Sequence, residues 1–342
     1  MSVDTLSDVL RAVRLTGAVF FNIEATSPWV AEAPPACETG AVMRGAERVI
    51  EYHAITRGAC WVGAVGEAPV RVEAGDVVAF PQGDAHVLSS EPGMRAPLGA
   101  ALSGAAGTIA FSELARRVTR PGAELPLRLR GGGGGEVTHV VCGFFGCDER
   151  PFNPLLAALP RMLHVRDHSG DGGGWLTRIV SVALAESSAR RAGRESVLAR
   201  MSELMFVELV RRHVDAMPPE QTGWLAGLRD DFVGRALGLL HEHPVRAWTL
   251  DELAREVGLS RSALAERFTH FVGMPPMQYL ARWRMQVAAG LLTSGTAKVA
   301  GVAAQVGYDS EAAFNRAFKK MVGMPPAAWR RARHAPPALQ EA

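Results

Sequence analysis

The pentapeptide Val272-Gly273-Met274-Pro275-Pro276 occurs a second time, fifty residues later, at positions 322–326. Each copy ends a stretch in which apolar residues recur at helical spacing. A glycine just after one helix and a proline at the start of the next are common signals of helix ends and starts. We therefore expect the C-terminal third of the chain to hold two versions of one helical unit.

The first unit begins with a capping box, because the Thr249 hydroxyl can accept from the backbone of Glu252 while the Glu252 carboxylate reaches back. Gly258 follows where the chain must turn, and Ser260 is suited to cap a second helix. Apolar residues at helical spacing predict the inner face of that second helix: Leu264, Phe268 and Phe271. Two short helices joined in this way form a helix-turn-helix.

The second unit repeats the pattern, with Gly307 at the turn, Asp309 or Ser310 as the cap, and one extra residue in the turn. Its predicted inner face lies fifty residues beyond that of the first unit: Phe314, Phe318 and Met321. Between the units, residues 275–292 predict one helix of about 25 Å. Such a helix can hold two DNA-reading helices about one DNA turn, or roughly 34 Å, apart.

Residues 18–89 show short apolar runs separated by turns that contain glycine and proline. This pattern is typical of a small all-β sandwich or barrel. The expected strands are Ala18–Ile23, Glu47–Ile55, Cys60–Val65, Val70–Val72, Val77–Phe80, Val87–Ser89 and Val137–Phe145. The last β-rich piece should end near Val165, and the glycine run 131–135 is expected to form a mobile loop.

After residue 174 the apolar spacing becomes helical, which predicts helices at Trp175–Ser188 and Ser196–Val214. Their wide apolar stripe must pack against its own domain or against a second copy of the chain. The predicted fold is thus α+β and multidomain. It has a β-barrel sensor at 1–170, a helical dimerisation segment and linker at 171–221, and an all-α domain with two helix-turn-helix units at 222–334.

Charge is divided unevenly along the chain. Residues 224–342 hold 15 Lys and Arg against 10 Asp and Glu, whereas residues 1–223 hold 22 against 25. A basic module beside an acidic one suits a DNA-binding domain attached to a domain that does not bind DNA. No apolar run reaches about 18 residues. Asp4 and Asp8 stand where a signal peptide would carry basic residues, so we expect a cytoplasmic protein with no membrane partner.

The two helical units resemble the DNA-binding domain of the AraC/XylS family of bacterial transcription regulators over residues 225–333. The resemblance rests on residues 254–268 with the turn Val257-Gly258-Leu259-Ser260, and on residues 303–318 with Val306-Gly307-Tyr308, then Lys319-Lys320, Gly323 and Pro326. A single helix-turn-helix pattern is weak evidence. Two of them at this spacing are specific.

The resemblance implies which side chains face DNA. The base-facing positions would be Arg261, Ser262, Ala265 and Glu266 in the first unit and Glu311, Ala312, Asn315 and Arg316 in the second. Arg316 could read guanine, Asn315 adenine and Glu266 cytosine. Phosphate contacts, which position a protein without reading sequence, are expected from Lys319, Lys320, Arg282 and Arg330.

Residues 75–86 fit the second cupin motif, G-x5-P-x-G-x2-H, although Ser90 stands where that motif ends in Asn. The first motif is poorly kept, since His53 and Gly58 remain without a His-x-His pair and a following Glu. The N-terminal half therefore resembles the cupin-like ligand-binding domain of one branch of AraC-type regulators. Barrel interiors hold small ligands readily, so His53 and His86 are candidates for binding an effector.

A metallo-cupin enzyme needs about three or four ligands around one ion, commonly histidines with a carboxylate. Only His53, His86 and His139 lie on expected strands, with no evident Glu between them. We therefore expect histidines held by hydrogen bonds, and the alternative is a bound divalent ion, with or without catalysis. No catalytic residue, metal ion or cofactor is expected.

Cys60, Cys142 and Cys147 are candidates for redox sensing, because some members of this cupin-bearing branch are thought to sense oxidants through cysteines. On one extended strand Cys142 and Cys147 would lie about 16 Å apart, too far for a disulfide without a turn. Sensing of a small molecule ranks above thiol sensing.

Together these features predict a sequence-specific transcription regulator controlled by a small-molecule effector. Its expected partners are double-stranded promoter DNA, a second copy of the chain in a homodimer, and RNA polymerase. The alternative is a cupin-type metalloenzyme with a helical appendage. A third possibility is a constitutive DNA-binding protein of the nucleoid type, which would bind with a steep salt dependence and no sequence preference.

Overall fold

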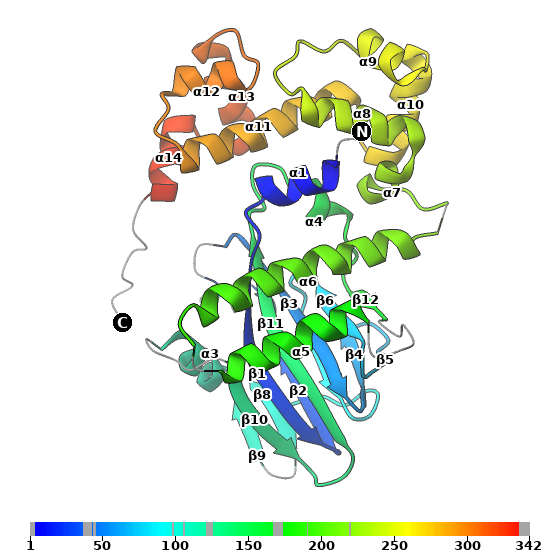
Figure 1. Ribbon diagram of the computed structural model, residues 1–342, viewed down its shortest axis with the longest axis vertical. Helices are drawn as coiled ribbons and strands as arrows, with labels where there is room; N and C mark the ends of the chain where they lie inside the picture. The colour runs from blue at the N-terminus through cyan, green and yellow to red at the C-terminus, as the bar shows by residue number, and fades with distance from the viewer. Residues whose placement is uncertain are drawn as a thin grey trace. The chain divides into compact units, whose positions relative to one another are not determined.

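A computed structural model describes residues 4–36, 43, 46–97, 99–104, 107–120, 126–166, 174–189, 191–218 and 220–334. The chain forms two compact units, whose elements are labelled in Figure 1. The barrel unit contains Arg14–Asp148 and Leu159–Ala216, and the helical unit contains Met1–Val13, Glu149–Ala158 and Met217–Ala342. Each unit is therefore built from segments that are separate in sequence.

The barrel unit has two six-stranded sheets within the part of the chain that the structure describes. Their strand orders are β10-β1-β11-β3-β6-β12 and β5-β4-β7-β2-β8-β9. The strands are β1 (Thr16–Thr26), β2 (Trp29–Ala33), β3 (Arg48–Arg57), β4 (Ala59–Ala64), β5 (Val70–Glu73), β6 (Val77–Phe80), β7 (His86–Ser89), β8 (Ala100–Gly104), β9 (Gly107–Ala110), β10 (Leu127–Gly132), β11 (Val137–Cys147) and β12 (Leu163–Val165). One hydrophobic core contains residues of both sheets, among them Val62 and Leu88 from one and Phe80 and Phe144 from the other.

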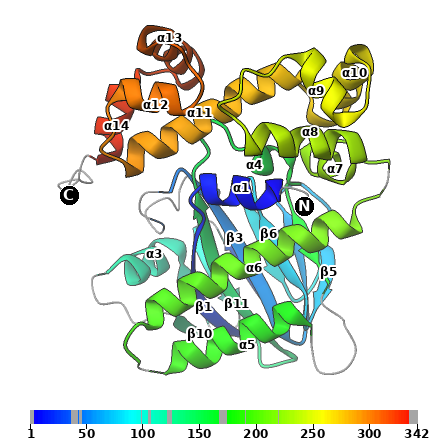
Figure 2. The ribbon, with the colours of Figure 1, turned by 45° about the horizontal axis from the view of Figure 1, so that its top comes forward.

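The described helices of the barrel unit are α3 (Phe111–Thr119), α5 (Trp175–Ser188) and α6 (Arg194–Ala216). Figure 2 shows α5 and α6 crossing the outer face of the sheet that contains β1 and β11. The contact between α6 and β1 is close, because a Cβ added at Gly17 would lie 2.4 Å from the Cβ of Ser202. Glycine at this position lets the helix lie directly on the strand.

The sheet under α6 is buried on both faces. Successive side chains of β3 and β11 point to opposite faces of this sheet, so each face carries a different set of residues. On the outer face the rings of Tyr52 and Phe145 stack with centroids 4.4 Å apart, and Phe206 of α6 lies 5.0 Å from Phe145. Their strand neighbours His53 and Phe144 belong to the opposite, inner face. Burial on both faces explains why β11 is almost continuously apolar.

The seven strands and two helices expected in this half of the chain are confirmed, and Val77–Phe80 and Trp175–Ser188 agree at both ends. The glycine run forms a loop only in part, because Gly131 and Gly132 belong to β10. Gly132 ends β10, and the N–H groups of Gly133 and Gly135 donate to the carbonyls of Thr26 and Ser27 at 2.8 and 2.9 Å. A Cβ at Gly132 would lie 1.8 Å from the Thr26 oxygen. Glycine is needed here for close backbone approach.

The described helices of the helical unit are α1 (Thr5–Ala12), α4 (Pro154–Ala158), α7 (Trp224–Arg229), α8 (Asp231–Glu242), α9 (Leu250–Val257), α10 (Arg261–Val272), α11 (Pro276–Ser294), α12 (Val299–Gln305), α13 (Glu311–Val322) and α14 (Pro326–His334). Helices α9 and α10 form the first helix-turn-helix, and α12 and α13 form the second. Figure 1 shows α11 running between them. Among the described residues, no helix is both long and apolar enough to span a membrane.

The predicted helix boundaries are confirmed at the caps. Thr249 and Glu252 form the capping box at the start of α9, and Gly258 ends that helix in the left-handed conformation with φ 83°. The hydroxyls of Ser260 and Ser310 cap α10 and α13, so Ser310 and not Asp309 is the second cap. Each helix therefore begins where a side chain satisfies a free backbone N–H.

The predicted inner faces are confirmed at two positions in each DNA-reading helix; at the third, Phe271 is buried only in part and the prediction for Met321 is wrong. Leu264, Phe268, Phe314 and Phe318 are fully buried. In contrast, Phe271 is half-buried and Met321 is 37% exposed. Both lie in the last turn of their helix, one residue before its end.

His241 on α8 is a buried histidine that packs against α11. Its ring stacks on Trp283 with centroids 3.9 Å apart, and its Nε2 lies 2.8 Å from the Tyr279 hydroxyl. Its Nδ1 has no hydrogen-bond partner among the described residues, and the nearest carboxylate oxygen, from Asp8, is 3.9 Å away. Burial lowers the pKa of His241 to about 3.

This burial makes the stability of the helical unit depend on pH. The unfolded chain binds a proton at His241 near the ordinary pKa of about 6.5, whereas the folded chain does not until the pH approaches 3. Stability is therefore complete above pH 6.5 and falls as the pH drops, by about 2 kcal/mol at pH 5. Hydrogen exchange of α8 and α11 amides should show this loss, and His241→Phe, which retains a ring beside Trp283, should remove it. An unchanged pH slope in His241→Phe would contradict this assignment.

Candidate functional sites

The two DNA-reading helices present different side chains to solvent. On α10 the exposed members of the predicted set are Arg261, Ser262 and Glu266, with Ala265 half-buried. On α13 they are Glu311, Ala312 and Arg316, with Asn315 half-buried. The four predicted base-facing residues of the first helix-turn-helix therefore all lie on α10, and the four of the second all lie on α13. The predicted phosphate-contacting residues Lys319, Lys320 and Arg282 are exposed as well, and Arg330 is half-buried.

The cations of α10 are already paired within the unit. Arg261 lies 3.6 Å from Asp251, and Arg267 makes a two-pronged contact with Asp230, at 2.5 Å for the shorter pair. In contrast, Arg316, Lys319 and Lys320 of α13 form no ion pair with any residue that the structure describes. Among the described residues, the cations of α13 are thus not engaged in ion pairs, whereas those of α10 are.

Arg284 on α11 ties the two helix-turn-helix units together. Its guanidinium donates to the carbonyl of Pro244 at 2.7 Å and to that of Arg246 at 2.9 Å, both in the loop before α9. A third N–H group lies 3.5 Å from the carbonyl of Gly307, in the turn of the second unit. Burial lowers the pKa of Arg284, although guanidinium stays charged at neutral pH. One side chain therefore contacts both the loop before the first helix-turn-helix and the turn of the second.

The turn at Gly307 requires glycine for two reasons. Its φ is 77°, in the left-handed region that other residues rarely adopt. In addition, a Cβ there would lie 2.7 Å from the Val245 carbonyl oxygen and about as close to the Arg284 guanidinium, at 3.0 Å. The two helix-turn-helix units are thus in contact at this point.

The end of α1 and the segment that contains α4 also pack on α11. No pattern in the sequence assigns either segment to the helical unit. The Gln286 side chain is 2% exposed. Its amide oxygen accepts from the backbone N–H of Phe152 at 3.0 Å, and its amide nitrogen donates to the carbonyl of Ala12 at 2.9 Å. One buried amide therefore holds the end of α1 and the segment that contains α4.

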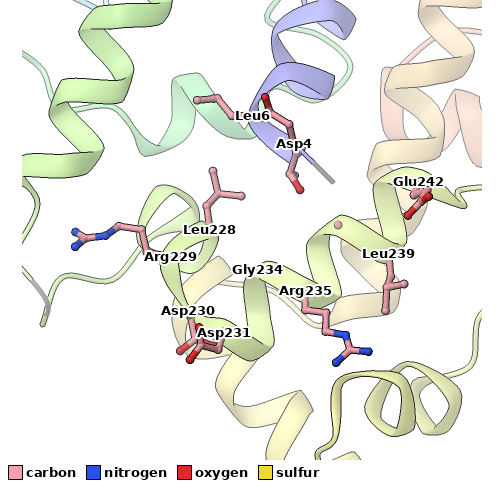
Figure 3. Close-up of a pocket in the computed structure, with 12 residues that line it drawn as sticks. Asp4, Leu6, Leu228, Arg229, Asp230, Asp231, Gly234, Arg235, Leu239 and Glu242 are labelled. Atoms are coloured by element: carbon pink, nitrogen blue, oxygen red, sulfur yellow. The ribbon is translucent and has the colours of Figure 1, made fainter. Parts of the chain in front are cut away.

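An open pocket of about 700 Å³ lies beside α1, α7 and α8 (Figure 3). Several of its charged groups already have structural partners. Asp4 caps α1, Asp230 caps α8 and holds Arg267, and Arg229 donates to the Met217 carbonyl. These contacts leave the pocket without a concentrated set of binding groups, so we assign no ligand to it.

The barrel interior contains a chain of polar contacts between His53 and His86, the two predicted effector-binding residues. Their Nε2 atoms lie 2.7 Å apart. Nδ1 of His86 donates to the carbonyl of Asp84 at 2.8 Å, because a carbonyl can only accept. His86 Nε2 must then accept from His53, whose Nδ1 is left to accept from the Cys142 thiol at 3.0 Å. The two histidines are hydrogen-bonded to each other in the barrel, as the sequence predicts.

Glu51 joins this group, and sequence reasoning missed it. Its two carboxyl oxygens lie 4.0 Å from Nε2 of His53 and 3.9 Å from Nε2 of His86. Burial raises the pKa of Glu51 to about 8 and lowers that of His86 to about 4. A signal was present, since residues i and i+2 of a strand share one face. Glu51 and His53 stand in that relation on β3. The third predicted strand histidine, His139, lies apart, 3.7 Å from Glu24.

The space beside this group is small and mostly apolar. A cavity of about 50 Å³ is bordered by Glu51, His53 and Cys142 at its polar end. The rest of its wall comes from both sheets and α3: Phe21, Ile23, Ala31, Glu32, Ala33, Leu88, Ala101, Leu102, Leu114, Leu129 and Val140. A water molecule needs roughly 10–15 Å³ on this measure, so the cavity can hold a few water-sized groups.

The three redox candidates are buried thiols. Burial raises the pKa of Cys60 to about 12 and raises the pKa of Cys142 far above its ordinary value. Cys142 and Cys147 lie on the one strand β11, and Cys147 is also buried. Since the thiolate is the reactive form, the pKa shifts of Cys60 and Cys142 work against rapid oxidation at neutral pH.

Two helix-turn-helix units joined through Arg284, in one chain with a barrel that contains a small, partly open cavity, define a DNA-binding regulator with a sensing domain. Residues 4–215 match the cupin family, and residues 253–332 match a helix-turn-helix domain family.

Similar proteins agree with these matches. An AraC-like transcription regulator of Streptomyces lividans is 32% identical over 332 residues, which are 96% of this chain and 98% of that protein. The regulator AlkR of Acinetobacter baylyi is 32% identical over 179 residues, 52% of this chain and 58% of that protein. The solved DNA-binding domain of AdpA, in complex with a target DNA, is 30% identical; the alignment covers 31% of this chain and 96% of that one, with a TM-score of 0.29. The chain belongs to the family of AraC-like transcription regulators, with a cupin sensing domain and a helix-turn-helix DNA-binding domain.

The contacts of Arg284 predict that it controls which operator spacing is accepted. In Arg284→Met the aliphatic stem remains, but the carbonyls of Pro244, Arg246 and Gly307 lose their donor. We expect the affinity for a selected operator to fall about tenfold, and discrimination against an operator with one inserted base pair to fall by a similar factor. Fluorescence anisotropy on both duplexes measures this. Arg282→Met, two residues away and exposed, is the control and should weaken both duplexes equally. Full discrimination in Arg284→Met would contradict the prediction.

Proposed function

We propose that this regulator binds promoter DNA sequence-specifically in the cytoplasm as a homodimer, and that a small-molecule effector in the barrel controls its binding. The observation that carries the proposal is the combination of two DNA-reading helix-turn-helix units joined through Arg284 with a small, partly open cavity in the barrel unit. RNA polymerase is the partner on which such a promoter-bound protein would act. An effector can shift the equilibrium between two states only if it binds them with different affinity.

The cavity constrains the class of effector. Its wall is apolar apart from Glu32 and the group formed by Glu51, His53 and Cys142. A largely apolar molecule with one polar end would match this lining. At about 50 Å³ the space is much smaller than the roughly 300–1,000 Å³ typical of ligand pockets. Binding therefore requires either a very small effector or movement of the wall, and movement is what a sensor needs.

Cupin-type enzymology is the competing proposal, and the homologues do not favour it. We propose that the chain is not an enzyme, since its relatives along nearly the whole length are transcription regulators. We also propose that His53 and His86 serve the effector site and that no residue of the chain is catalytic. The redox candidates Cys60, Cys142 and Cys147 take second place as sensors, because two of them have strongly raised pKa values.

Base recognition is proposed to depend mainly on α13. Arg316 can donate two hydrogen bonds to guanine, and Asn315 can read adenine. On α10, Arg261, Ser262, Ala265 and Glu266 remain the proposed contacts, with Arg261 already near Asp251. Lys319, Lys320 and Arg282 are proposed to contact phosphates.

Substitution of Arg316 tests both the assignment and the function. Genome-wide footprinting of the purified protein should give an enriched operator. On that operator, Arg316→Ala should cost about 1–3 kcal/mol of binding free energy and relax the preference at one base pair. Lys320→Ala is the control, since loss of a phosphate contact should weaken all duplexes alike and reduce the salt dependence. Equal loss for Arg316→Ala on a scrambled duplex contradicts the base contact. The absence of any enriched site contradicts the proposed function.

The dimer is proposed to form through the outer face of α5 and α6. Trp175 and Val182 on α5 are 49% and 56% exposed, and Val197 and Leu204 on α6 are 43% and 42% exposed. Residues seven apart lie on the same face of a helix, so each helix carries an apolar pair directed away from its own core. Large exposed apolar side chains grouped in this way commonly mark an interface.

Val182→Asp should therefore weaken self-association about tenfold or more, because burial of a valine stabilises an interface by about 1.5 kcal/mol or more. Sedimentation velocity over a concentration series measures the change. Ser181→Asp places the same charge at the exposed neighbouring position, outside the apolar pair, and should have little effect. Identical association of the two variants, or a wild-type protein that stays monomeric at all concentrations, would refute this interface.

A further inference from the structure

The loop between α8 and α9, residues 243–248, lies between the two helix-turn-helix units (Figure 1). On one side of it, a Cβ on Gly307, in the turn before α13, would lie 2.7 Å from the carbonyl oxygen of Val245. On the other side, the Arg246 guanidinium lies 3.6 Å from the carboxylate of Glu256, in the last turn of α9. The loop therefore contacts the segments that lead into both DNA-reading helices, α10 and α13.

Hydrogen bonds order the backbone of this loop before any partner binds. The N–H group of Arg246 donates to the carbonyl of His243 at 3.2 Å, and the indole N–H of Trp248 donates to the same carbonyl at 3.1 Å. Arg284 on α11 donates to the carbonyls of Pro244 and Arg246. A loop that is already ordered loses less conformational entropy when it binds. The loop is thus suited to hold a side chain at a defined position.

Two neighbouring side chains of this loop are exposed and are of kinds that DNA grooves accept. Arg246 stacks on the buried Trp248, with its guanidinium carbon 3.9 Å from the ring centroid. Its pair with Glu256 is longer than a hydrogen bond, and both side chains are 44% exposed, so the pair contributes little in water. Val245 is 51% exposed. The loop therefore presents a positioned cation beside an apolar side chain.

The geometry of DNA places a minor groove next to this loop. When two recognition helices enter successive major grooves on one face of a duplex, the minor groove faces the protein between them. In homeodomains the loop between the first two helices contacts the DNA backbone. Residues 243–248 join the corresponding helices of the first unit, α8 and α9. The loop therefore has a position from which a side chain can reach the minor groove.

We propose that Arg246 enters the minor groove between the two major-groove sites and selects A·T base pairs there. This rests on the proposed function, because it requires α10 and α13 to occupy successive major grooves. A·T tracts narrow the minor groove and make its potential more negative, which favours an inserted guanidinium. G·C pairs place the guanine N2 amino group in that groove, where it opposes a cation. Apolar side chains commonly accompany arginine in minor-groove contacts, and Val245 is placed to pack on the adjoining sugars.

Binding of the full-length protein to variants of its selected operator tests the proposal. The duplexes differ only in the base pairs between the two major-groove sites, which are A·T, G·C or inosine·C. Inosine lacks the N2 amino group, so inosine·C has the minor-groove pattern of A·T and the major-groove pattern of G·C. In fluorescence anisotropy, the wild type should bind the A·T and inosine·C operators alike and the G·C operator about tenfold more weakly. Arg246→Ala should bind the A·T operator about tenfold more weakly and lose the preference.

Glu256→Gln separates a DNA contact of Arg246 from a structural role of its ion pair. Removing the competing carboxylate should strengthen binding about twofold to threefold and keep the preference for A·T. If the pair served only to hold the loop, Glu256→Gln would weaken binding as Arg246→Ala does. Arg255→Ala is the matched control, since it removes an exposed arginine one residue away on α9, and it should keep the preference. Circular dichroism should show that all three variants are folded.

Three outcomes overturn the proposal: binding of the inosine·C operator as weak as that of the G·C operator, a retained preference in Arg246→Ala, or weaker binding by Glu256→Gln. An operator that is bound but is insensitive to the composition of its central base pairs contradicts this inference alone. The absence of any enriched operator contradicts the proposed function, and this inference with it. The two failures are therefore distinguishable.

Discussion

The guanidinium of Arg284 is the group on which the arrangement of the DNA-reading helices depends. It joins the loop before α9 to the turn of the second unit through carbonyls of Pro244, Arg246 and Gly307. Charge-assisted hydrogen bonds are about twice as strong as neutral ones, and a planar guanidinium can address several acceptors at fixed angles. Without them these carbonyls would depend on solvent in a half-buried place. If these bonds hold α10 and α13 at one separation, as the Arg284→Met prediction tests, the geometry of two major grooves becomes part of recognition.

The two helix-turn-helix units share their packing residues but not their outward surfaces. Leu264 and Phe268 in α10 correspond to Phe314 and Phe318 in α13, and all four are fully buried. The outward faces do not repeat, because α10 has its cations near Asp251 and Asp230 whereas α13 keeps its own unpaired among the described residues. A paired cation must give up its partner before it can bind a phosphate or a base, and this lowers the net gain. We infer that α13 supplies most of the electrostatic attraction, while α10 contributes mainly through shape and position.

The sequence predicts those features of the fold that depend on neighbouring residues. Helix caps such as Thr249 and Ser260, and the strand Val77–Phe80, follow from local hydrogen bonding and periodicity. Features that depend on distant segments were missed or misjudged. The glycine run was misjudged because Thr26, more than one hundred residues earlier, lies against Gly132. Glu51 was missed because its proximity to His86 depends on how two sheets face each other, which no local pattern encodes. Gln286 gave no signal that it would hold Phe152 and Ala12.

The strand β11 connects the polar group of the barrel with the point where the chain leaves it. Cys142 on this strand contacts His53, and five residues later the strand ends at Cys147. The next residue, Asp148, accepts two hydrogen bonds from Arg14, at 2.6 and 2.8 Å, just before β1 begins. β1 and β11 are paired from Thr16–Gly146 to Thr26–Val137, so the two chain connections that lead out of the barrel begin side by side at this end. Both connections continue into segments that the Gln286 amide holds.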